Sequence, residues 1–184
     1  RSASGDRHWV RLWLWSLVGL IIIMITVGGL TRLTDSGLSI TEWDPVMGAI
    51  PPLNAAAWQA AFAAYQTTAE FAVQNAAMSL AEFKVIFWWE WGHRQLGRFI
   101  GLTWALGFAL LFFTGKLPKA RRLSLFAIGP FIGLQGVIGW LMVHSGLDGV
   151  RLDVASYWLM AHLGAAFALL GYIYWSLQIF SRSE

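Results

Sequence analysis

The residues that could do chemistry in this sequence are ionisable groups set inside apolar stretches. The segment FWWEWGHRQLGRFIGL, residues 87–102, carries Glu90, His93, Arg94 and Arg98 in a short run, and His162 lies in a later apolar stretch. Ionisable groups inside an apolar helix are costly and usually face an interior or a cavity. This pattern therefore predicts a functional site or a self-contained ion pair.

Helical spacing brings the carboxylate close to two of these groups. On a helix that begins near Leu80, Glu90 and His93 are three residues apart and share a face, and Glu90 reaches Arg94 at the four-residue spacing. One interpretation makes Glu90 a reactive acid beside a ligand-binding imidazole. The other is a Glu90–Arg94 ion pair that satisfies itself and has no further role.

The two imidazoles are expected at matched depth in a helix bundle. His93 follows Trp88 and His162 follows Tyr157 at the same spacing, on helices predicted to run in the same direction. Two facing imidazoles suit a flat tetrapyrrole ligated on both faces, and bundle interiors commonly hold such cofactors. The alternative is a pair of hydrogen-bonded histidines without a ligand. We interpret His144 as an interfacial residue, with a substitute ligand as the alternative.

The arginines and glycines of the same segment have two interpretations each. Arg94 and Arg98 could bind haem propionates, because a guanidinium fork matches a carboxylate, or they could extend to the membrane interface. Gly92, Gly97 and Gly101 could let a planar ligand approach the backbone, or they could serve ordinary helix packing.

The composition indicates a membrane protein. Of 184 residues, 57% are hydrophobic and 12% are charged, which is too apolar for an ordinary soluble domain of this length. The absence of Cys excludes disulfides, cysteine-based zinc clusters and thiol nucleophiles. The basic residues cluster only in KLPKARR, between two apolar spans. We therefore attribute the basic charge to membrane topology and expect no nucleic-acid partner.

Four segments are long enough to cross a bilayer as helices, which takes about 20 residues each. They cover approximately residues 9–30, 85–113, 123–143 and 157–180. We predict an all-α integral membrane protein, a four-transmembrane-helix antiparallel bundle that forms a single haem-binding domain over residues 1–184. The basic residues near the span ends predict that both termini and the middle link are cytoplasmic.

The connection between the first two spans, about residues 31–84, is too long and too rich in turn signals for a plain linker. It predicts a compact lid at the membrane surface. Within it, NAAAWQAAFAAYQ is expected to form a short interfacial helix capped by Asn54. The sequence SLAE matches a capping box between Ser79 and Glu82 and predicts the start of the second spanning helix.

Four motifs together resemble a known family. They are VGGLTRLTDSGLSITEWDPVMGAIPPL, MSLAEFKVIFWWEWGHRQLGRFIGL, LQGVIGWLMVHSGL and VASYWLMAHLGAAFALL. In order and spacing they are similar to the amino-terminal half of haem A synthase of the alphaproteobacterial and mitochondrial type. The similarity runs from about residue 27 to residue 170.

The resemblance implies an oxidoreductase of the bacterial inner membrane that oxidises a methyl group of haem O to the formyl group of haem A for cytochrome c oxidase biogenesis. It implies an eight-span architecture of two four-helix halves, of which this chain resembles one, with haem b expected in the other half. By motif, His93 and His162 become the axial ligands and Glu90 becomes the acidic residue of the reaction. Haem O synthase, oxidase assembly factors and a second copy of the chain are the expected partners.

Other classes of function remain open at this stage. A dihistidine b-type cytochrome would only transfer electrons, a haem carrier would only deliver its ligand, and a structural assembly subunit would bind no haem. Glu90 distinguishes the first of these, because electron transfer needs no acid beside the ring.

Overall fold

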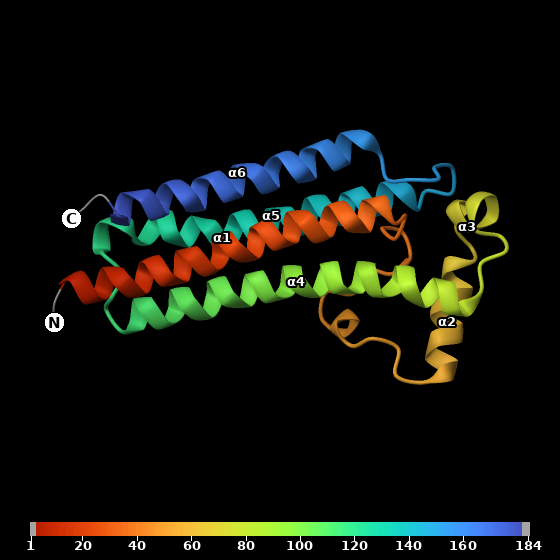
Figure 1. The fold of residues 1–184 in the computed structure, drawn as a ribbon, viewed down its shortest axis with the longest axis horizontal. Coiled ribbons are helices and arrows are strands. Elements are labelled where there is room, and N and C mark those ends of the chain that lie inside the picture. The colour runs from red at the N-terminus through yellow and green to blue at the C-terminus, as the bar shows by residue number, and fades with distance from the viewer. Residues whose placement is uncertain (1–2, 182–184) are drawn as a thin grey trace. The chain divides into compact units, whose positions relative to one another are not determined.

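Four long helices dominate the computed structural model, which describes residues 3–181 (Figure 1). Each contains a stretch that is long and apolar enough to cross a membrane. They are α1 (Ala3–Leu33), α4 (Leu80–Phe113), α5 (Arg122–Gly146) and α6 (Ser156–Ser181). Residues 3–181 form helices, turns and irregular connections but no strand, so the predicted all-helical fold with four candidate spans is confirmed.

The chain folds as two compact units, and each long helix contributes residues to both. Among the described residues, the first unit contains 3–25, 96–136 and 163–181. The second unit contains residues 26–95 and 137–162. The predicted single domain over residues 1–184 stays a prediction.

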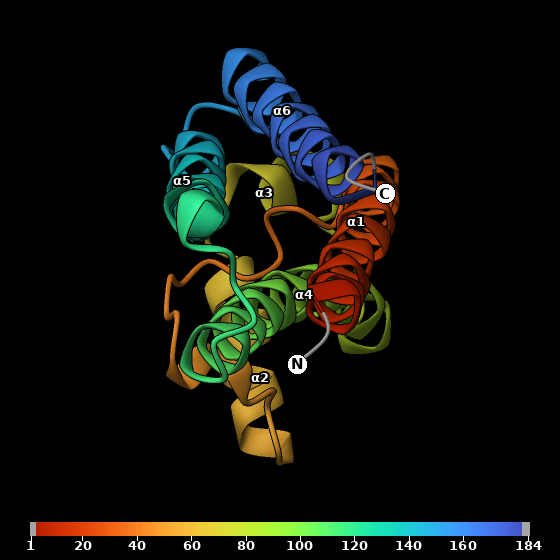
Figure 2. The same cartoon turned by 90° about the vertical axis from the view of Figure 1, so that its left-hand side faces the viewer.

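Figure 2 shows the four long helices nearly end-on. All four contribute residues to an apolar core of the first unit. The indole of Trp13 donates to the carbonyl of Thr103 at 3.1 Å, which ties α1 to α4. Two glycines make room for indole rings: a Cβ at Gly107 would lie 2.2 Å from Trp13, and one at Gly129 would lie 2.2 Å from Trp104. Close ring-to-backbone contact therefore fixes how these helices pack within this unit.

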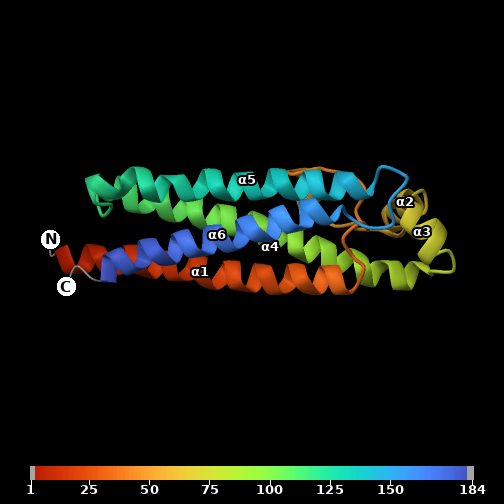
Figure 3. The same ribbon diagram turned by 90° about the horizontal axis from the view of Figure 1, so that it is seen from above.

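The second unit contains the lid, which in the structure is residues 34–79 between α1 and α4. The lid holds a short 3₁₀ helix, η1 (Met47–Ala49), and the helices α2 (Ala55–Tyr65) and α3 (Ala69–Gln74). Both α2 and α3 lie beside the first turns of α4 (Figures 1 and 3).

An aromatic cluster fastens α2 to α4. Buried rings of Trp58, Phe62 and Tyr65 on α2 pack against Phe83 and Phe87 on α4. Ring centroids are 4.9 Å apart for Trp58 and Phe87, and 5.0 Å apart for Phe62 and Phe83. Such pairs add stabilisation beyond the burial of apolar area, so the lid is packed onto the helix that carries the ionisable run.

Local capping signals begin the helices where the sequence predicts. The side chain of Asn54 accepts a hydrogen bond from the N–H of Ala57 at the start of α2. Ser79 and Glu82 form the reciprocal bonds of a capping box immediately before α4. Both predictions are confirmed. The short helix α3, capped by Thr68, is not predicted, and the position of α2 at a membrane interface stays a prediction.

Candidate functional site

The part of α4 that belongs to the second unit carries Glu90, His93 and Arg94. The four-residue spacing predicts an ion pair between Glu90 and Arg94, and the structure contains it: Nη2 of Arg94 lies 2.5 Å from Oε1 of Glu90. Helical geometry alone produces this contact, since side chains four residues apart are neighbours on a helix surface.

The carboxylate of Glu90 is buried and hydrogen-bonded on both oxygens. Only 2% of the residue is exposed. Its Oε2 accepts from the hydroxyl of Ser39 and from the N–H of Ile40, each at 2.7 Å, while Arg94 occupies Oε1. Charge-assisted hydrogen bonds offset the cost of burying the carboxylate. The carboxyl group of Glu90 is therefore held in one orientation by the lid and by its own helix.

Arg94 connects Glu90 to the backbone of the lid. Its guanidinium donates to the carbonyl of Ile40 at 2.8 Å and to the carbonyl of Glu42 at 3.0 Å. The same group lies over the ring of Trp43, 5.8 Å from the ring centroid. The predicted role of Arg94 toward haem propionates stays a prediction, and the contacts that the structure gives are with Glu90 and with the lid.

Each imidazole of the predicted ligand pair lies against a glycine of a neighbouring helix. A Cβ at Gly28 on α1 would lie 3.1 Å from Nε2 of His93, and a Cβ at Gly139 on α5 would lie 3.1 Å from Cε1 of His162. Helices α4 and α6 thus bring both rings into the same unit.

The second unit gathers most of the predicted site residues but not all of them. It holds Glu90, His93, Arg94 and His162, whereas Arg98 belongs to the first unit. The ligand, propionate and catalytic roles assigned to these five residues stay predictions.

His144 lies beside the lid, in the last turn of α5. Its side chain is exposed and its ring stacks on Trp140, with centroids 6.0 Å apart. Both residues line a cavity of about 40 Å³ together with Trp43 and Arg94. That volume suits about one water molecule. The position at the membrane interface that the sequence favours for His144 stays a prediction.

Sequence reasoning missed the lid residues that bind the ionisable run. Ser39 and the backbone of Ile40 hold Glu90, and the side-chain amide of Gln95 donates to the carbonyl of Ala49 at 2.6 Å. The only available signal is a serine between apolar residues in the motif SGLSI. Backbone N–H and carbonyl groups are common to almost all residues, so the sequence cannot show that Ile40 and Ala49 bond through theirs. These two contacts were therefore not predictable.

For Gly92, Gly97 and Gly101, approach of a planar ligand and ordinary helix packing both stay predictions. Near Gly92 and Gly101 a Cβ would meet nothing within 4 Å, and near Gly97 it would meet Met24. The glycines in contact with imidazoles are Gly28 and Gly139, on α1 and α5. They come from other helices, which the periodicity of α4 cannot reveal.

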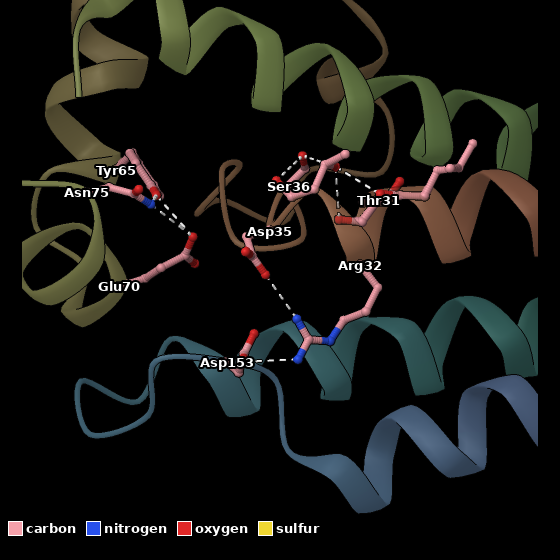
Figure 4. A network of polar contacts seen from close by, with 10 residues as sticks. Thr31, Arg32, Asp35, Ser36, Tyr65, Glu70, Asn75 and Asp153 are labelled. Carbon is pink, nitrogen blue, oxygen red and sulfur yellow. Dashed lines mark hydrogen bonds and ion pairs between the residues drawn. The ribbon is translucent and has the colours of Figure 1, made fainter.

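A second polar network of the lid surrounds Glu70 (Figure 4). The residue is 3% exposed, and its carboxylate accepts from the hydroxyl of Tyr65 at 3.0 Å. Asn75 in turn donates to the Tyr65 oxygen at 2.7 Å. Burial raises the pKa of Glu70 to about 7, and the negative charges of Asp153 and Asp35 act in the same direction. Burial likewise raises the pKa of the Tyr65 phenol.

An arginine at the end of α1 completes the network in Figure 4. Arg32 donates to Asp35 at 3.1 Å and to Asp153, on the connection between α5 and α6, at 3.0 Å. These side chains are well exposed, and exposed pairs contribute about 0–1 kcal/mol. The pairs therefore orient the two connections more than they stabilise them.

Four apolar helices define a multi-pass helical membrane protein, and one of its units holds a buried acid, an arginine and two histidines. The COX15-CtaA family, described as cytochrome oxidase assembly protein, matches residues 11–184. The chain belongs to this family, as the resemblance of its motifs predicted.

Known relatives carry a consistent name. The chain is 58% identical over its whole length to a protein named heme A synthase of Dinoroseobacter shibae, of which it covers 48%. It is 54% identical over its whole length to that of Cereibacter sphaeroides, of which it covers 47%. It is 53% identical over 98% of its length to that of Paracoccus denitrificans, of which it covers 48%.

The chain spans about half the length of the curated relatives that it matches. No solved structure matches it.

Proposed function

We propose that this chain forms the methyl-oxidising part of a haem A synthase, in which haem O is the substrate and haem A the product. Its relatives named heme A synthase, at 53–58% identity, support the proposal. The observation that carries it is the placement of one buried carboxylate, Glu90, on the same unit as His93 and His162.

The two histidines would hold the haem. Neutral imidazole is a common axial ligand of haem iron, and His93 and His162 lie on different helices of one unit. Their rings lie against Gly28 and Gly139, positions where a side chain would crowd the imidazoles. The bound haem supplies the iron and the methyl group that is oxidised.

Glu90 would act on the methyl group. Formally, oxidation of a methyl group to a formyl group consumes one water molecule and releases four protons and four electrons, and the electrons must pass to an external electron acceptor. A fixed anion nearby stabilises the developing positive charge, or accepts a proton. The hydrogen bonds from Ser39, Ile40 and Arg94 support this role because they orient the carboxylate before the substrate arrives.

The remaining assignments belong to the same proposal. Arg94 and Arg98 would pair with the propionates of haem, and haem b would occupy the other half of the eight-span architecture. The protein would lie in a bacterial inner membrane with both termini cytoplasmic. Haem O synthase, cytochrome oxidase assembly factors and further copies of the chain are the proposed partners.

Extraction and mass analysis of the haem that copurifies with the protein tests the proposal. We expect Glu90→Gln to retain haem absorbance and to abolish haem A formation, because the change removes the charge and keeps the shape. Glu42→Gln is the matched control, since Glu42 is exposed and contributes only its backbone to the site.

Replacement of the histidines tests the ligand assignment. We expect His93→Ala and His162→Ala each to lose haem absorbance, and His144→Ala to keep it. Haem A formation at the normal level in Glu90→Gln would reject the role of Glu90. Haem B as the only pigment would favour a dihistidine cytochrome instead.

A further inference from the structure

Ser39 is the lid side chain in direct contact with Glu90. The serine is 2% exposed and its hydroxyl oxygen lies 2.7 Å from Oε2 of the carboxylate. A second acceptor, the carbonyl of Ile86, lies 3.3 Å away. A hydroxyl has one hydrogen to donate, and the shorter, charge-assisted contact is the stronger of the two. The serine therefore donates mainly to Glu90.

The two oxygens of Glu90 are held from different parts of the second unit. Oε2 receives the hydroxyl of Ser39 and the N–H of Ile40, both from the lid, and Oε1 receives Arg94 from α4 itself. Terminal rotation of a glutamate carboxylate is soft, with broad preferences. The two lid donors therefore act with Arg94 to fix the plane of the carboxylate.

We propose that Ser39 is a positioning residue for Glu90, which sets the orientation of the carboxylate toward the methyl group of haem O. The inference rests on the proposed function of Glu90. Loss of the Ser39 hydroxyl leaves Oε2 with the backbone donor alone and lets the carboxylate turn.

Three variants separate positioning from packing. Ser39→Ala removes the donor, and Ser39→Thr retains a hydroxyl. Ser36→Ala is the matched control: Ser36 lies in the same turn, is fully buried and bonds through its hydroxyl to Thr34, not to Glu90. If Ser39→Ala does not accumulate in membranes, Ser39→Cys keeps a similar shape with a weaker donor and replaces it.

The first measurement is haem A formation in membranes that carry the complete protein. We expect Ser39→Ala to lower it by about tenfold or more, since a hydrogen bond to a charged group contributes that much. Haem absorbance should be unchanged. Ser39→Thr should restore most of the activity, and Ser36→Ala should behave as the parent. Equal activity of Ser39→Ala and the parent would overturn the proposal.

The second measurement does not depend on turnover. Infrared difference spectra of the haem-free protein identify the carboxylate band that Glu90→Gln removes. We expect this band to shift in Ser39→Ala and to stay in place in Ser36→Ala. An unshifted band in Ser39→Ala overturns the positioning role. A shifted band together with normal haem A output from Glu90→Gln would instead reject the proposed function and leave the contact itself established.

Discussion

Glu90 combines a large cost of burial with an unusually complete set of partners. A buried ion pair is seldom worth more than a well-packed apolar pair of similar volume, because both charges lose their hydration. Here the pair of Glu90 and Arg94 also binds the backbone of Ile40 and Glu42. We infer that the pair serves the specific geometry of the lid rather than the stability of the fold.

At the residue scale, Glu70 gives the clearest prediction of pH dependence. Its pKa is raised from 4.5 to about 7 by burial, so between these values the folded lid binds a proton that the unfolded chain releases. The contribution of Glu70 to stability is complete below pH 4.5 and is lost as the pH rises through about 7. Asp35 and Asp153 oppose its ionisation, while the Tyr65 hydroxyl favours the anion.

We expect Glu70→Gln to remove this loss of stability. The unfolding temperature of the parent should fall by roughly a few degrees between acidic and neutral pH, and that of the variant should fall less. Thermal unfolding in detergent measures both. Glu42→Gln is the control, because that side chain is exposed. An equal fall of the unfolding temperature in Glu70→Gln and in the parent would contradict the assignment of this pH dependence to Glu70.

At the scale of elements, contact between an imidazole and a glycine backbone couples α1 to α4 and α5 to α6 within the second unit. A methyl group at Gly28 or Gly139 would lie 3.1 Å from His93 or His162, a distance that forces the ring to move by a few tenths of an ångström. Ligand rings must be held close to their productive geometry by such neighbours.

We therefore expect Gly28→Ala and Gly139→Ala to lower haem occupancy several-fold and to change the absorption spectrum of the haem that remains. Gly92→Ala is the matched control, since a Cβ there meets nothing within 4 Å, and it should bind haem normally. Absorption spectra of the purified variants make the comparison. Normal spectra for both Gly28→Ala and Gly139→Ala would contradict the expected loss of haem.

The elements differ in how far the sequence predicts them. The four spans follow from runs of apolar residues, and the starts of α2 and α4 follow from Asn54 and from the Ser79–Glu82 box, all of which are local signals. The Glu90–Arg94 pair is equally local. Ser39 reaches Glu90 from a distant part of the chain, and α3 is too short for a periodic pattern, so neither was predictable.

At the scale of the whole molecule, the four apolar helices make this a multi-pass membrane protein. The basic residues near the ends of the spans predict its orientation. The chain contains no Cys, so single cysteines can report the side of the membrane without interference. Lys119 in the link between α4 and α5, and Gln59 on α2, are both exposed positions.

We expect a membrane-impermeant thiol reagent to label Gln59→Cys in intact cells. Lys119→Cys should be labelled only after the membrane is opened, because basic links are retained on the cytoplasmic side. Mass analysis of the labelled protein measures both. The reverse pattern would place the lid and the site on the cytoplasmic side and would reject the proposed orientation.

The junction between α4 and the lid uses main-chain groups for most of its bonds. Arg94 donates to the carbonyls of Ile40 and Glu42, and Glu90 accepts from the N–H of Ile40. Every amino acid offers a carbonyl, and every one except proline offers an N–H. Homologues can therefore diverge at positions 40 and 42 and keep this junction. A change at Glu90 or Arg94, in contrast, leaves the other charged group without its ion-pair partner.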